Sequence, residues 1–157
     1  MNPIDKARSD PRLQSLLKNL ANQVKIKYVR SKDDGWGSNL EGTVATIWWC
    51  GCKHPSASLA HELLHIQLQL NGYRRIRVGI SNIASPETIK RLMDCIDNEI
   101  QHHKIYPVFI SMGFTPEQFY RDSDAEVEQF LRQAVGNGFT SVADASIVFF
   151  SLIAPGG

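Results

Sequence analysis

The first third of the chain alternates apolar and polar residues in the way that half-buried strands do. In VKIKYVR, residues 24–30, lysines stand between apolar or aromatic side chains, and this period of two predicts a strand with one buried face. The run TVATIWW, residues 43–49, is rich in β-branched and aromatic residues and predicts a second strand. The turn-rich segment SKDDGWGSNLEG, residues 31–42, separates them. We therefore expect the two strands to pair as a hairpin across this long loop.

Helices are predicted where a capping residue stands before a proline, because proline is tolerated in the first helical turn. Asp10, which precedes a proline, predicts a helix over about residues 11–20. Ser85 before Pro86 predicts a long helix that ends or kinks at the Tyr-Pro pair 106–107.

The same signal recurs near the C-terminal end. Thr115 before Pro116 predicts one short helix or turn, and a further helix is expected over about 123–135, stopped by the GNG sequence at 136–138. The apolar tail over 141–153 predicts a final helix.

A central helix is predicted between these segments, over about residues 56–70. Ser56 or Ser58 can cap its start, and the Asn-Gly pair 71–72 is typical of its end. The stretch 75–81 alternates weakly and could be a strand or an irregular loop. Two or three strands and five or so helices indicate an α+β domain over 1–157, with a small antiparallel sheet packed on the central helix.

Charge and composition exclude several classes of partner. Lys and Arg number 17 against 16 Asp and Glu, and they are scattered, so we expect neither nucleic acid nor an anionic membrane as a partner. No apolar run approaches the ~20 residues of a membrane span, and the first residues lack the apolar region of a secretory signal. Three cysteines do not suggest a disulfide framework. A cytoplasmic location is the expectation.

The central helix carries the strongest chemical signal, because His61 and His65 are four residues apart and Glu62 follows the first. Side chains at that spacing share one face of a helix, with Cβ atoms about 5–6 Å apart. Both imidazoles could bind one Zn²⁺, and Glu62, about 100° around the helix, could take a proton from a metal-bound water.

The simpler interpretation is that both histidines pack or face solvent, since this short pattern arises by chance in many chains. The surrounding pattern favours metal binding. Apolar residues occupy two arcs of the helix, so that the helix is packed on two sides: Leu59, Leu63, Ile66 and Leu70 on one, and Ala57, Ala60, Leu64 and Leu68 on the other. Buried histidines need partners for their ring nitrogens, and a shared metal supplies one for each.

The sequence His61-Glu62-Leu63-Leu64-His65 resembles the HExxH signature of zincin metallopeptidases. The resemblance implies a zincin-like fold, a Zn²⁺ cofactor and hydrolysis of peptide bonds by a Glu-activated, metal-bound water. In those enzymes a strand along the cleft precedes the helix, and the stretch 43–49 stands in that place. The metzincin extension is absent, because Leu68 and Asn71 occupy the positions of its glycine and third histidine.

The third metal ligand is expected on the next long helix. Asn98-Glu99 resembles the Asn-Glu pair of the thermolysin-like gluzincins, in which the glutamate is the third ligand, although His103 stands where a further carboxylate would be. Glu99 is therefore favoured, with His103 or His102 as the alternatives. A carboxylate further on is the remaining option: Asp122, Asp124 or Glu126.

Helical periodicity ranks the two histidines. The predicted core face of that helix is centred near Ile96 and Ile100, and His103 lies closer to it than His102, so His103 is expected to be the more buried. A histidine that does not bind the metal could stabilise the transition state, as could Tyr106 or Tyr73, although both tyrosines are more simply read as packing residues.

A second cluster, Cys50, Cys52 and His54, invites a structural-zinc interpretation. Structural sites usually space cysteines by two to four residues and need a second pair, whereas Cys95 is the only other cysteine. Thiols packed around a strand end are the preferred interpretation.

The leading hypothesis is a small cytoplasmic zinc metallopeptidase acting on a peptide or protein. One alternative is a processing protease with a single dedicated protein target, and another is a non-catalytic binding module that a metal stabilises. Imidazole and carboxylate ligands would also suit Mn²⁺ or Fe²⁺.

Overall fold

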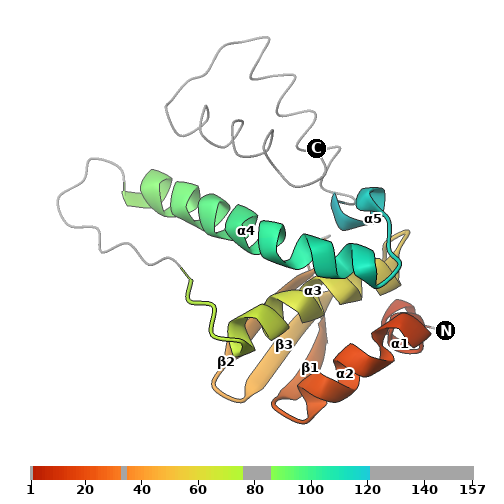
Figure 1. Cartoon of the computed structure of the whole chain (residues 1–157). Coiled ribbons are helices and arrows are strands. Elements are labelled where there is room, and N and C mark those ends of the chain that lie inside the picture. The colour runs from red at the N-terminus through yellow and green to blue at the C-terminus, as the bar shows by residue number, and fades with distance from the viewer. Residues whose placement is uncertain (1, 33–34, 76–85, 121–157) are drawn as a thin grey trace. The chain divides into compact units, whose positions relative to one another are not determined.

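A computed structural model of the chain is shown in Figure 1 and describes residues 2–32, 35–75 and 86–120. The helices predicted over 123–135 and 141–153 lie outside these ranges, as do Ser85 and nearly all of the stretch 75–81. The chain divides into two compact units, 1–73 with 105–121 and 74–104 with 122–157. A single domain over 1–157 stays a prediction.

A three-stranded mixed sheet forms one layer of the first unit (Figure 1). Its strands are β1 (Lys25–Arg30), β2 (Gly37–Glu41) and β3 (Val44–Trp49), in the order β1-β3-β2. Strand β1 is parallel to β3, whereas β2 is antiparallel to it. Strand β3 is therefore the central strand, and β1 and β2 are the edges.

Both predicted strands are present, but the expectation that they form a hairpin, and with it the expectation of an antiparallel sheet, is wrong. The segment predicted as a loop contains β2, which pairs with β3 across the two-residue turn Gly42–Thr43. Gly42 has a φ of 56°, a left-handed conformation that glycine adopts without steric cost. Because this hairpin takes one edge of β3, β1 pairs with the other edge.

Helices cover one face of the sheet. Helix α1 (Pro3–Arg8), with Asn2 as its N-cap, was not predicted, although its Asn-Pro start repeats the cap-and-proline signal seen elsewhere. The helix predicted over 11–20 is confirmed as a short 3₁₀ turn, η1 (Pro11–Leu13), that continues into α2 (Gln14–Ala21). Both α1 and α2 contact the central helix, and α2 also contacts β1.

The central helix α3 runs from Pro55 to Leu70. Neither Ser56 nor Ser58 caps it: His54 is the N-cap, and the Ser58 hydroxyl instead donates to the His54 carbonyl at 3.1 Å. The Asn-Gly end is confirmed, because Gly72 has a φ of 95° and its N–H bonds back to the Gln69 carbonyl.

Helix α4 (Pro86–Ser111) is longer than expected. It does not end at Pro107 but continues for a further turn, although Pro107 has no N–H to donate to the carbonyl four residues earlier. Helix α5 (Pro116–Tyr120) confirms the short helix expected after Thr115. Over the described residues, no helix combines the length and the hydropathy that a membrane crossing needs.

Buried apolar side chains of the helices and of β3 form one core, and half-buried side chains of β1 and β2 pack against it. Its fully buried large members come from η1, α2, β3, α3, α4 and α5: Leu13, Leu20, Ile47, Leu59, Leu63, Leu64, Ile66, Phe109 and Phe119.

Hydrogen bonds of Asp10 and Arg12 connect the start of η1 to the turn after α4. The Asp10 carboxylate accepts from the Arg12 backbone N–H at 3.0 Å and lies 2.7 Å from the Arg12 guanidinium. That guanidinium also donates to the Gly113 carbonyl at 3.1 Å and stacks on Phe114 at 3.9 Å. The side-chain bond from Arg12 is the main reason that the pKa of Asp10 falls from 3.8 to about 2.

We expect Asp10→Ala to lower the melting temperature at pH 7 by about 2–4 °C, because losing an N-cap costs about 1 kcal/mol. The carboxylate contributes stability above its unfolded pKa of 3.8, and this contribution is lost as the pH falls towards about 2. Thermal unfolding of both proteins at pH 7 and near pH 2 measures the difference. Asp5→Ala, on the exposed face of α1, is the matched control. A difference that persists unchanged near pH 2 would contradict this account.

Candidate metal centre

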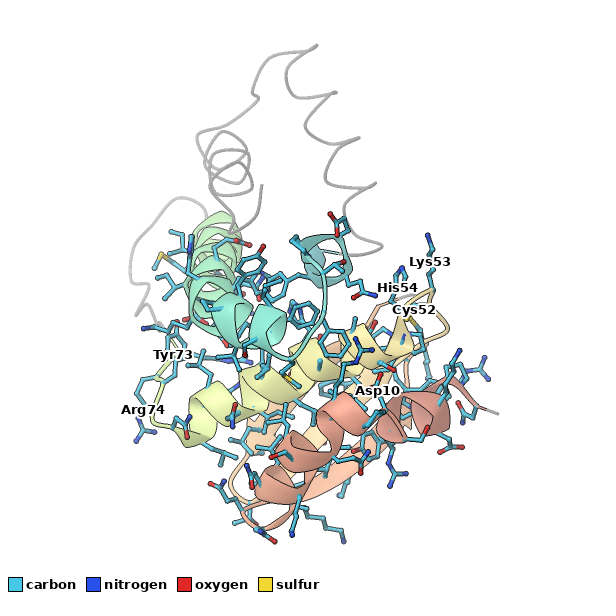
Figure 2. All side chains as sticks on the ribbon, turned by 45° about the vertical axis from the view of Figure 1, so that its right-hand side comes forward. Asp10, Cys52, Lys53, His54, Tyr73 and Arg74 are labelled. Carbon is cyan, nitrogen blue, oxygen red and sulfur yellow. The ribbon has the colours of Figure 1, made fainter. Side chains whose placement is uncertain are left out.

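Helix α3 is buried on nearly every side, which is what places its polar residues in the interior. Every residue from 57 to 66 is buried, and α1, α2, α5 and β2 all contact the helix. Figure 2 shows the turn with Cys52 and His54 at one end of α3 and Tyr73 at the other. The predicted packing on two sides is confirmed.

His61 and His65 face each other within this core. Their exposed fractions are 8% and 7%, their ring centroids lie 4.8 Å apart, and the two Nε2 atoms lie 3.0 Å apart. An ion about 2.05 Å from both Nε2 atoms would see them at about 94°. That angle is somewhat smaller than the tetrahedral angle. A small increase in the distance between the two Nε2 atoms would therefore let both rings bind one ion.

The tautomers follow from this arrangement. One Nε2–H can donate to the lone pair of the other ring, whereas a shared cation takes the lone pairs of both rings. Metal binding therefore places the remaining proton of each ring on Nδ1.

His102 completes a group of three imidazoles. Each of His61, His65 and His102 offers one ligand atom, and these atoms lie within 4.8 Å of one another. In the part of the chain that the structure describes, this is the group of His, Cys, Asp or Glu side chains that could hold a metal ion. His102 stands one turn before Ile105, a core residue on the same helix. Three imidazoles suit Zn²⁺ and several other transition metals.

Glu99 lies beside His102 on α4. Its Oε1 is 3.4 Å from His102 Nδ1, and the side chains are 18% and 12% exposed. A carboxylate on the second nitrogen of a ligand histidine fixes its tautomer and ring orientation. Glu99 is not in the group of three, and its role as third ligand stays a prediction.

The predicted core face of α4 is wrong at Ile100, whereas Ile96 is half-buried. Ile100 is 37% exposed, whereas Asp97, Gln101 and Ile105, at intervals of four residues, are at most 6% exposed. Gln101 donates to Asp97 at 2.7 Å, so each side chain satisfies part of the other's hydrogen bonding inside the protein. The periodicity of apolar residues could not predict this buried face of α4, because two of its residues are polar.

The predicted order of burial of His102 and His103 is wrong for the same reason. His103 is exposed and His102 is largely buried, so the expectation that His103 is the more buried is wrong. The carboxylates Asp122, Asp124 and Glu126 lie outside the described residues.

Glu62 is 7% exposed and follows His61 on α3. Its role as the base stays a prediction. Tyr73 and Tyr106 are half-buried.

An aromatic wall adjoins the histidines and was not predicted. Phe119 of α5 packs on His61 with 4.6 Å between ring centroids, and Tyr106 packs edge-on against Phe119 at 5.1 Å. Phe109 also packs edge-on against Phe119, with 5.0 Å between ring centroids. This contact could not be predicted, because α3 and α5 are far apart in the sequence. The sequence indicated only that a short helix starts after Thr115.

The cysteine cluster shows no metal geometry. Cys52 Sγ lies 3.2 Å from the Ser58 hydroxyl, and His54 Nδ1 lies 3.4 Å from the Gln118 amide nitrogen. Over residues 2–32, 35–75 and 86–120, Cys50, Cys52 and His54 belong to no group with ligand spacing.

No family model, curated protein or solved structure matches this chain. The metal centre therefore stands on its own geometry.

Zinc should stabilise the folded chain, because an ion that binds only the native state adds its binding free energy to folding. At a hundredfold excess over Kd we expect the melting temperature to rise by about 5–10 °C. His61→Ala and His65→Ala should each remove this rise, and His54→Gln, a histidine at the start of the same helix, should retain it. Differential scanning fluorimetry with and without zinc, together with elemental analysis, makes the measurement. A rise that survives in both alanine variants would place the metal elsewhere.

Proposed function

We propose that the chain is a zinc-dependent metallopeptidase. The observation that carries the proposal is the pair of buried imidazoles 3.0 Å apart with a buried glutamate next to the first. The HExxH pattern could occur on a surface helix, where its histidines would point into water. Here the helix is enclosed, and its polar residues are gathered where solvent is largely excluded.

His61, His65 and His102 are the proposed ligands, each through one ring nitrogen. Glu99 then orients His102 through Nδ1, and this arrangement uses the 3.4 Å approach already present. The alternative keeps Glu99 as the ligand, as the resemblance implies, with His102 beside it. Three protein ligands leave one position open, which is the pattern of catalytic rather than structural zinc sites.

Bound zinc would act as a Lewis acid and lower the pKa of a coordinated water towards ~7. The Glu62 carboxylate is the proposed acceptor of the proton of the attacking water. After attack on the carbonyl carbon, the same carboxyl group passes this proton to the departing amide nitrogen, which leaves as an amine.

Tyr106 is the proposed donor to the developing oxyanion. It contacts Phe119, which contacts His61, so its position is coupled to the ligand helix through two ring contacts. His103 is exposed, which makes it the weaker candidate for this role.

Glu62→Gln separates chemistry from binding, because glutamine keeps the shape of the side chain and cannot accept the proton. We expect zinc content to stay at the wild-type level and kcat on a cleaved peptide to fall by about 10²–10⁴-fold. A peptide library read by mass spectrometry supplies the substrate. Loss of zinc together with activity would instead make Glu62 part of the metal site, and zinc binding without hydrolysis by the wild type would favour the non-catalytic module.

The third ligand can be assigned by comparing three residues of α4. His102→Ala should weaken zinc binding by more than about 100-fold, whereas Glu99→Gln, which affects only orientation, should weaken it by about 10–100-fold. His103→Ala is the control and should leave Kd unchanged, because His103 is exposed. Competition with a chromogenic chelator measures each Kd. A larger loss for Glu99→Gln than for His102→Ala would make Glu99 the ligand.

A further inference from the structure

Strand β1 carries a row of cations at one edge of the sheet. Lys25 and Lys27 alternate with the half-buried Ile26 and Tyr28, so they lie on the face of the sheet opposite to the core. With Arg30 and Lys32 they put four exposed positive side chains on eight consecutive residues. Within the described ranges, none of the four forms an ion pair.

A surface hollow lies at the Arg30–Lys32 end of this row. Val29, Arg30, Ser31, Lys32 and Trp48 line it, and it encloses about 370 Å³. Val29 and Trp48 are opposite each other across the β1–β3 pairing and are 43% and 37% exposed. Among the described residues, the lining therefore combines two apolar side chains with two cations.

The backbone of β1 is also available along its outer side. Lys25 N–H donates to the Thr43 carbonyl and Ser31 N–H to the Trp49 carbonyl, both towards β3. In a parallel ladder alternate residues bond to the neighbouring strand. Ile26, Tyr28 and Arg30 therefore direct their backbone groups away from β3, and no other described strand pairs with β1.

We propose that the outer edge of β1 binds an extended acidic segment of a partner protein as an added strand. Backbone groups of Ile26, Tyr28 and Arg30 pair with the segment. Its side chains alternate between the two faces of the sheet, so that carboxylates on one face lie opposite Lys25 and Lys27 and a carboxylate on the other lies opposite Arg30. One apolar side chain enters the hollow between Val29 and Trp48. The site lies on β1 and the end of β3 and needs no metal, so it goes beyond the proposed peptidase activity.

The observations favour a peptide over a single-stranded nucleic acid. Nucleic-acid surfaces of this kind stack successive bases on several aromatic rings, and the hollow offers one indole. A phosphate backbone crossing the sheet would also meet Glu41, which lies on the same face as Lys25 because both are opposite Val44. An acidic strand along β1 stays at the other edge.

The test is direct binding to the full chain, in the presence of a chelator so that the metal centre plays no part. The probe is a fluorescein-labelled peptide of glutamate residues with one valine for the hollow, followed by fluorescence polarisation. N-methylation of the residues that face β1 should weaken binding at least about tenfold, whereas N-methylation of the residues between them should have little effect. Equal weakening by both patterns would overturn strand addition, and this comparison needs no protein variant.

Charge-reversed variants test the cations. Lys25→Glu with Lys27→Glu should weaken binding at least about tenfold. Lys18→Glu with Lys53→Glu, which makes the same change in net charge at two exposed positions outside β1, should leave Kd within about twofold. Equal losses in the two double variants would reduce the effect to net charge and overturn the proposal. Tighter binding of an oligothymidylate than of the peptide would also overturn it.

Discussion

The structure depends on burying a helix that is not wholly apolar. Helix α3 places His61, Glu62 and His65 among side chains that are almost fully enclosed. Enclosing polar groups is costly unless they are satisfied by one another, by neighbours or by an ion. The fold meets this constraint by turning the two imidazoles towards each other, which also creates the geometry of a chelate. Packing and candidate chemistry therefore have the same origin.

The surroundings of α3 hold the imidazoles in place. The sheet and the N-terminal helices enclose the apolar arcs of α3, and the Phe119 ring lies on His61. Phe109 and Tyr106 support that ring in turn. Edge-on aromatic contacts have a preferred geometry, so the wall restrains the orientation of the His61 ring as well as excluding water. An active centre needs this kind of support, because catalysis is sensitive to small displacements of its groups.

Local rules predicted local features well. Alternation predicted β1, a cap before proline predicted the starts of η1 and α5, and the Asn-Gly pair predicted the left-handed end of α3.

The errors arose where a feature depends on residues far apart in sequence. Strand β2 is short, polar and rich in turn-forming residues, so its place in the sheet comes from pairing with β3 rather than from its own preference. Asp97 and Gln101 are buried together and joined by a hydrogen bond, and a hydrophobic pattern cannot predict such a polar pair. The facing histidines were predicted because an i, i+4 pair is itself a local feature, whereas the Phe119 wall required tertiary information.

The position of β2 in the sequence, between the paired strands β1 and β3, also has a kinetic consequence. The β2–β3 hairpin closes over Gly42 and Thr43 alone, and a turn this short can form within microseconds. Parallel pairing of β1 with β3 must instead bring together two segments that are separated by β2 and its flanking loops. Non-local contacts of this kind slow folding, because loop-closure entropy is lost before they form. Assembly should then begin at the hairpin and add β1 afterwards. Until β1 arrives, the strand that leads into the histidine helix has one unprotected side, and this is the stage at which the nascent chain would be most prone to self-association.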